Sequence, residues 1–255
     1  MNADRYVRLD SAEIIRTVEV LATRIGERFP TSGLRDVCHR LVEIARHASQ
    51  RSAQIGEPIL WLRAVTAALA VLILVSFTAM IAVLAPQARN ISFIDFIQSL
   101  EAGISELVFI GAAVLFLVTF EGRVKRRRAL QAIHELRSLA HIIDMHQLTK
   151  DPERILFGGR RTAASPKHNL TPFELDRYLD YCSEMLALIG KIAALYVQNF
   201  QDSQAVEAVN DIEQLTSGLS RKIWQKIMIL HNVCGALETE PRPSGSDSEP
   251  AGSVP

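Results

Sequence analysis

The longest apolar run of the chain covers residues 64–85, which are 22 residues without a charge, a glycine or a proline. At about 1.5 Å of rise per residue, a helix of this length measures about 33 Å, which matches the hydrocarbon thickness of a bilayer. A soluble helix rarely stays apolar on every face over such a length. The run therefore predicts a transmembrane helix within 58–85, where Pro58 suits the first turn and Trp61 suits the membrane interface.

A second apolar run covers residues 107–120, and it reaches membrane-spanning length only with the residues just before it, Glu106 among them. We predict a second transmembrane helix over 102–120. It is preceded by a short external loop and an interfacial helix over 86–101, in which Ser92 caps the helix start. Two crossings form a hairpin that returns the chain to the side from which it came.

The distribution of lysine and arginine near the two segments predicts their orientation. Five cations follow the second segment closely, whereas the predicted external loop contains only Arg89. We therefore expect a protein of the cell (inner) membrane with both termini in the cytoplasm. A cation beside an anionic leaflet gains roughly 1 kcal/mol, so we also expect the run to contact anionic lipid headgroups. The run consists of Arg123, Lys125, Arg126, Arg127 and Arg128.

Outside the apolar segments, the pattern has the three-and-four spacing of amphipathic helices. Residues 1–57 contain two such helices, and the first begins at Asp10 with Glu13 in the place of a capping-box acid. We expect these helices to form an antiparallel cytoplasmic hairpin.

The region 121–238 carries further apolar stripes, and the first continues without a breaker to about Leu148. We therefore expect the second membrane segment and this cytoplasmic stalk to be one long helix. Thr171 and Glu174 have the spacing of a capping box, with a proline in the first turn, and they begin a helical hairpin.

The predicted fold class is all-α: an integral membrane two-helix hairpin with a cytoplasmic helical bundle, part of it a coiled-coil-like hairpin. Residues 239–255 are nearly devoid of large apolar side chains, and we predict that they form a disordered tail.

The charges balance overall, with 28 Lys+Arg and 28 Asp+Glu, but they are unevenly placed. Residues 121–168 hold eleven bases and five acids, whereas 169–255 hold six bases and twelve acids. We predict that the acidic hairpin docks on the basic stalk; the alternative is that both surfaces are simply solvated.

The common nucleotide-binding, hydrolase and metalloprotease motifs are missing from the sequence, so we expect neither an enzyme nor a cofactor. The three cysteines are far apart and indicate neither a disulfide framework nor a zinc knuckle. The basic run has no interleaved aromatic residues, so we expect no nucleic-acid partner.

Two helix faces carry polar residues at the spacing of metal ligands, but neither has an identifiable fourth ligand. Polar residues on any exposed helix face have the same spacing, so no metal site is predicted. These faces carry His39, Glu43 and His47, and His134, His141 and Asp144. Arg160 and Arg161 follow two glycines and form a candidate anion-binding loop; the alternative is a flexible basic connection.

Glu106 is the unusual residue of the apolar segments, and it shares a helix face with Asp95 and Ser99. A carboxylate that faces lipid costs up to about 3 kcal/mol, so we expect Glu106 to face a partner helix or a wet cavity. Asp95, Ser99 and Glu106 are therefore the candidate pore or polar membrane residues. The alternative is a carboxylate that reaches water at the interface.

In layout alone, this plan is similar to the two-span bacterial effector and channel families of the SLATT kind, in which cytoplasmic helices control a membrane pore. It also resembles the plan of the CorA-type magnesium channels, but the Gly-Met-Asn signature of that family is missing. We expect a non-enzymatic two-pass membrane protein, a sensor or scaffold whose cytoplasmic bundle binds a protein partner or self-assembles. The alternative is an oligomeric ion channel or pore-forming effector with a cytoplasmic helical control domain, which needs a ring of subunits.

Overall fold

The computed structural model describes residues 8–87, 93–152 and 170–239. The regular elements in these ranges are all helices, which confirms the all-α class for the described part of the chain. They are α1 (Ser11–Arg28), α2 (Gly33–Gly56), α3 (Leu60–Gln87), α4 (Phe93–Leu148), α6 (Pro172–Gln198) and α7 (Ser203–Thr239).

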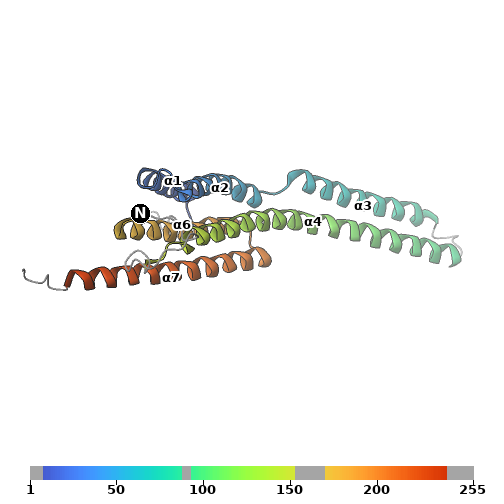
Figure 1. Ribbon diagram of the computed structural model, residues 1–255. Coiled ribbons are helices and arrows are strands. Elements are labelled where there is room, and N and C mark those ends of the chain that lie inside the picture. The colour runs from blue at the N-terminus through green and yellow to red at the C-terminus, as the bar shows by residue number, and fades with distance from the viewer. Residues whose placement is uncertain (1–7, 88–92, 153–169, 240–255) are drawn as a thin grey trace, which may run out of the picture.

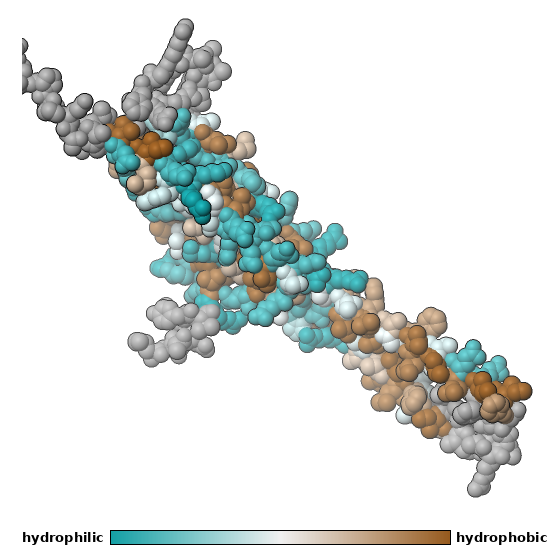
Figure 2. Space-filling view, turned by 90° about the horizontal axis from the view of Figure 1, so that it is seen from below, coloured by the Kyte–Doolittle hydropathy of each residue, from teal (hydrophilic) through white to brown (hydrophobic). Residues whose placement is uncertain are grey.

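The molecule is elongated, with a bundle at one end and a two-helix extension at the other (Figure 1). The bundle consists of α1, α2, α6, α7 and the second half of α4, whereas α3 and the first half of α4 run side by side beyond it (Figure 1). We call this second part the apolar extension and define it as residues 60–120. Figure 2 shows that its visible surface is mostly hydrophobic, while the bundle surface is mostly hydrophilic.

Local signals in the sequence explain where two of the bundle helices begin. The side chain of Asp10 accepts a hydrogen bond from the N–H of Ala12 at 2.9 Å, but Glu13 pairs with Arg16 instead of completing a capping box. At α6 the predicted capping box is confirmed. Thr171 Oγ1 accepts from the N–H of Glu174, whose carboxylate accepts from the N–H of Thr171 at 2.8 Å.

The central helix of the bundle is α6, which contacts α1, α2, α4 and α7. Its burial on several faces follows from these contacts, and the apolar stripes of the surrounding helices converge on it. Side chains with almost no exposed surface in this core include Leu41, Leu136, Ile143, Leu186, Ile189 and Tyr196. The single core ties together helices that are far apart in the sequence.

The helix α4 has 56 residues and passes from the apolar extension into the bundle without a break. This confirms the prediction that the second apolar segment and the stalk form one helix. The predicted cap at Ser92 lies outside the described residues, as do residues 240–255 of the predicted tail.

The acidic hairpin of α6 and α7 packs along the second half of α4. Ion pairs join Arg126 to Asp202 at 2.6 Å and Arg137 to Asp211 at 3.0 Å, both between α4 and the hairpin. The same interface buries apolar side chains of all three helices, so opposite charge is only part of what holds the hairpin on the stalk.

Two stretches of the described chain, within Gly33–Ala79 and Leu100–Leu148, are long and apolar enough to cross a membrane by length and composition. Only 6% of the most apolar part of the first and 0% of that of the second is buried. A core helix of a soluble protein would be mostly buried, so the two helices lack the covering that such a helix has.

Candidate anion-binding groove

The basic run occupies the first turns of α4 after the apolar extension, where α4 enters the bundle beside the end of α2. An open groove of about 1030 Å³ lies between these two helices. Side chains from both helices line it: Arg51, Gln54 and Ile55 from α2, and Arg123, Arg126, Arg127 and Arg128 from α4.

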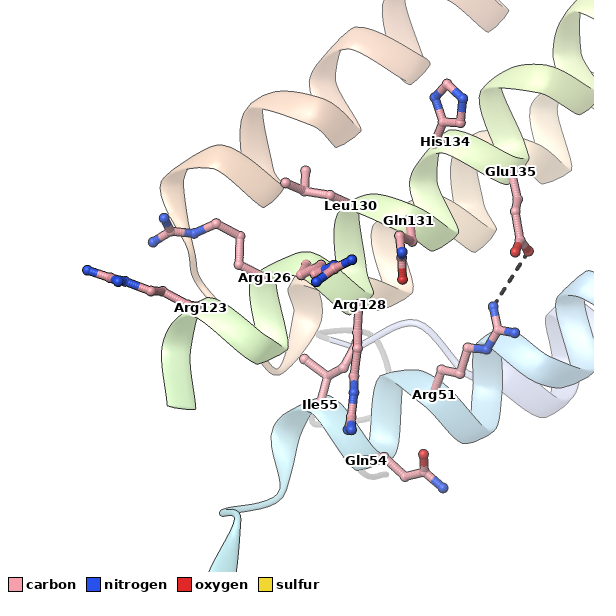
Figure 3. Close-up of a pocket in the computed structure, with 11 residues that line it drawn as sticks. Arg51, Gln54, Ile55, Arg123, Arg126, Arg128, Leu130, Gln131, His134 and Glu135 are labelled. Atoms are coloured by element: carbon pink, nitrogen blue, oxygen red, sulfur yellow. Dashed lines mark ion pairs between the residues drawn. The ribbon is translucent and has the colours of Figure 1, made fainter. Parts of the chain in front are cut away.

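The two helices contribute their side chains to the groove in different ways. Arg128 extends from α4 toward α2, where Gln54 and Ile55 lie (Figure 3). Arg51 extends from α2 toward Glu135 on α4, and their charged groups are 3.5 Å apart (Figure 3). The groove therefore combines residues that are some seventy to eighty positions apart in the sequence.

Ion pairs neutralise only some of the arginines in the groove. Arg51 has Glu135 as its partner, and Arg126 has Asp202. Within the described ranges, no carboxylate lies within 4.0 Å of the charged groups of the other three, and each of these residues is exposed. These three, Arg123, Arg127 and Arg128, are called the unpaired arginines below.

Asp202 accepts hydrogen bonds from both α4 and the start of α7 at this end of the bundle. It accepts a hydrogen bond from Arg126 at 2.8 Å, and it accepts from the N–H groups of Gln204 and Ala205, both at 3.2 Å, at the start of α7. Burial acts to raise the pKa of Asp202, but the hydrogen bonds that it accepts and the charge of Arg126 together keep this pKa below its usual value. Arg126 is thus tied to the start of α7.

Lys125 lies outside the groove lining, although it belongs to the same basic run. Its ammonium is 2.9 Å from Glu121, and the two side chains are only 11% and 16% exposed. Glu121 also accepts a hydrogen bond from the N–H of Ile59 at 3.2 Å and lies 3.7 Å from Arg63. We call this arrangement the Glu121 clasp: Glu121, Lys125, Ile59 and Arg63.

The clasp joins α4 to the start of α3, where the chain leaves the bundle for the apolar extension. The hydrogen bond from Lys125, followed by that from the Ile59 N–H, lowers the pKa of the Glu121 carboxyl group. Glu121 was not among the residues predicted from the sequence. A carboxylate directly after an apolar segment, with a lysine four positions later, is the signal that would have found it.

Glu106 faces the partner helix within the apolar extension. Ser76 Oγ on α3 donates a hydrogen bond to the Glu106 carboxylate at 3.0 Å. A space of about 30 Å³ beside this pair is also lined by Gly103 and Ile110. Ser76 was not a predicted site residue, because a lone serine in an apolar run carries no signal without its neighbour across the helix pair.

Other predicted site residues fall outside what the structure describes. Arg160 and Arg161 of the candidate anion-binding loop lie in 153–169, and the side chains of Asp95 and Ser99 are not described either. The structure therefore brings together only part of the predicted set.

The two helix faces with metal-ligand spacing hold no cluster of ligands in the described part of the chain, where no three His, Cys, Asp or Glu side chains could hold a metal ion. Glu43 instead lies 2.8 Å from Arg40, and Asp144 accepts a hydrogen bond from Gln147 at 2.6 Å.

The chain matches no protein-family model, and neither a curated protein nor a solved structure is found to be similar to it.

Proposed function

We propose that the chain is a two-pass membrane protein that inserts its apolar extension in the bilayer and holds its helical bundle at the cytoplasmic face. The bundle acts without catalysis, as a scaffold or sensor that binds a protein partner or a second copy. One observation carries the proposal: the exposed apolar surface is concentrated on the extension and ends where the basic groove begins.

The concentration of apolar surface is the first support. In the described part of the chain, 31 large apolar side chains are exposed, and 21 of these belong to the apolar extension. Burying one such side chain fully gains roughly 1.5–3 kcal/mol, so a surface made of many of them is costly in water. Contiguous apolar surfaces of this extent are typical of membrane or protein interaction sites.

The position of the charges is the second support. The unpaired arginines follow the apolar extension at once, on the side of the bundle, and a concentration of Lys and Arg is typical of the cytoplasmic side of a membrane protein. This favours an orientation with the bundle and both termini inside.

The length of α4 is the third support. Its 56 residues make one helix of about 84 Å, which passes from the extension into the bundle core. A displacement of the membrane part would therefore be carried directly to the bundle, as a sensor or scaffold requires.

A matched pair of substitutions tests membrane insertion. Leu74 on α3 and Val20 on α1 are both apolar and exposed, by 63% and 55%. If the extension is in lipid, Leu74→Arg costs about 2.5–3.5 kcal/mol of insertion free energy, whereas Val20→Arg changes little. The readout is the fraction of protein that stays with the membrane after alkaline extraction.

Equal retention of both variants, or release of the wild type by alkali, would contradict the proposal.

Topology reporters fused at residues 50, 90 and 160 test the orientation. We expect the fusion at 90 alone to be active outside, and an externally active fusion at 160 would remove the two-pass arrangement.

An oligomeric channel is the second candidate function, favoured by the Glu106 carboxylate, which accepts a hydrogen bond from Ser76 between the two helices of the apolar extension. A single hairpin encloses no path, so this candidate needs a ring of subunits. A ring of four or more subunits in detergent, with an ion flux in liposomes that Glu106→Gln alters, would replace the scaffold proposal. The scaffold proposal predicts no ion flux from the wild type or from Glu106→Gln. Ser76→Ala is the matched variant, because it removes the other partner of the same hydrogen bond.

A further inference from the structure

We propose that the groove between α2 and α4 binds the headgroup of a phospholipid that carries two phosphate groups. The inference rests on the membrane location proposed above, and it names the class of lipid that this surface selects.

The charge of the groove determines how many phosphates it neutralises. Two of its five arginines already have carboxylate partners, which leaves the three unpaired arginines. A headgroup with one phosphodiester would leave two of these charges without a counterion, whereas a headgroup with two phosphates leaves one. The groove therefore favours the lipid with the larger charge at a single position.

The donors in the groove suit phosphate oxygens. A guanidinium presents a fork of N–H groups that binds phosphate through two parallel hydrogen bonds. Arg128 brings such a fork to the α2 side of the groove, and the amides of Gln54 and Gln131 add neutral donors on its walls (Figure 3). Donors on two separate helices can engage two phosphates of one molecule at the same time.

The place of the groove in the fold favours a lipid over a soluble anion. Arg123 lies three residues after Phe120, the last residue of the apolar extension, which is about 4.5 Å along the helix axis. A headgroup in the groove would thus have its acyl chains beside the exposed apolar side chains of α3 and α4. Basic pockets at this depth, between helices on the cytoplasmic side, are typical sites for lipids with more than one phosphate.

The size of the groove fits the same ligand. A volume of about 1030 Å³ is at the upper end of the range in which proteins hold compact organic ligands, and a single phosphate fills only a small part of it. Bulk attraction between a basic surface and an anionic membrane does not require such a groove, so the groove predicts selectivity in addition to affinity.

The experiment measures lipid binding to the full chain in detergent micelles, with diphosphatidylglycerol and phosphatidylglycerol compared at equal total phosphate. We expect the two-phosphate lipid to bind at least about tenfold more tightly. Arg127→Gln with Arg128→Gln should abolish this preference. The matched control removes two charges from the exposed surface of α7, by Arg221→Gln with Lys222→Gln, and should keep the preference.

The inference would be overturned if the wild type bound both lipids with equal affinity, or if the variant with Arg127→Gln and Arg128→Gln kept the preference. It would also be overturned if inorganic pyrophosphate displaced the lipid at a concentration similar to that of the lipid itself. The last result would assign the groove to a free phosphate compound. Thermal unfolding of each variant shows whether the fold is kept, and Arg127→Gln alone, on an exposed side chain, provides a second variant that should reduce the preference.

The failure of this inference is distinct from failure of the proposed function. Protein that resists alkaline extraction but shows no lipid preference would contradict the lipid site alone. Protein released by alkali would contradict the membrane location itself.

Discussion

Removal of the Glu121 carboxylate should loosen the joint between the bundle and the apolar extension. Glu121→Gln keeps an oxygen that can accept from the Ile59 N–H but removes the charge that pairs with Lys125. Glu121→Ala removes both. We therefore expect the alanine variant to be the less stable of the two.

The structure sets the size of the effect. A hydrogen bond to a charged group contributes about 1.5–3 kcal/mol when both partners are shielded from water, and exposed ion pairs contribute about 0–1 kcal/mol. The Glu121–Lys125 pair lies between these cases, since the two side chains are 16% and 11% exposed. We expect a loss of about 1–2 kcal/mol for Glu121→Gln and about 2–3 kcal/mol for Glu121→Ala.

A double-mutant cycle isolates the pair itself. Lys125→Met removes the cation and keeps the apolar stem, so Glu121→Gln should cost little in its presence, with a coupling energy of about 1 kcal/mol. Glu207→Gln on α7 is the matched control because Glu207 is exposed, and we expect a change within about 0.5 kcal/mol.

The assay uses the two tryptophans of the chain. Trp61 lies two residues after Ile59 at the start of α3, so its fluorescence reports on the clasp in a Trp224→Phe background. Unfolding in detergent is followed by this emission and by helical circular dichroism. If Glu121→Gln behaves like Glu207→Gln and the coupling energy is zero, the clasp contributes nothing to the joint.

The clasp also predicts a pH dependence with a definite sign. The pKa of Glu121 is lowered in the folded state, so its carboxylate form stabilises the fold. This stabilisation is fully present above the unfolded pKa of about 4.3, and it is lost as the pH falls through the folded pKa. Glu121→Gln should lack this part of the acid sensitivity.

Close packing, burial and charge in the bundle can each be tested by one variant or condition. Gly56→Ala should destabilise the protein by about 1–3 kcal/mol, because the new methyl group would lie 2.9 Å from Cβ of Asn199. Gly218→Ala, which has open space around it, should instead stabilise α7 by up to about 1 kcal/mol. Thermal unfolding should therefore show changes of opposite sign in the unfolding free energy of the two variants. Cys38 and Cys182 are fully buried, and burial raises the pKa of each thiol to about 12, so a variant without the third cysteine should react with maleimide only after unfolding. Salt near 1 M, where the Debye length is about 3 Å, should only slightly increase protease cleavage between α4 and α6, because apolar burial also holds α7 on α4; a large increase would show that charge dominates.

Elements that depend only on neighbours along the chain could be predicted without the structure. The capping box at Thr171, the end of α4 at Leu148 and the continuity of the long helix all follow from local hydrogen bonding and from a hydrophobic period without a breaker. The two apolar helices of membrane-spanning length follow from composition over a single stretch. None of these features needs a distant residue.

Which helix faces meet could be seen only in the folded chain. Helical spacing defines the apolar side of α6, but not that this helix becomes the centre of the bundle with four neighbours. The basic run looked uniform in the sequence, yet Lys125 joins the Glu121 clasp, Arg126 holds Asp202, and the unpaired arginines face the groove with Arg51. The physical reason is that a period locates a side chain around its own helix axis, whereas its partner depends on how helices distant in the sequence pack against one another.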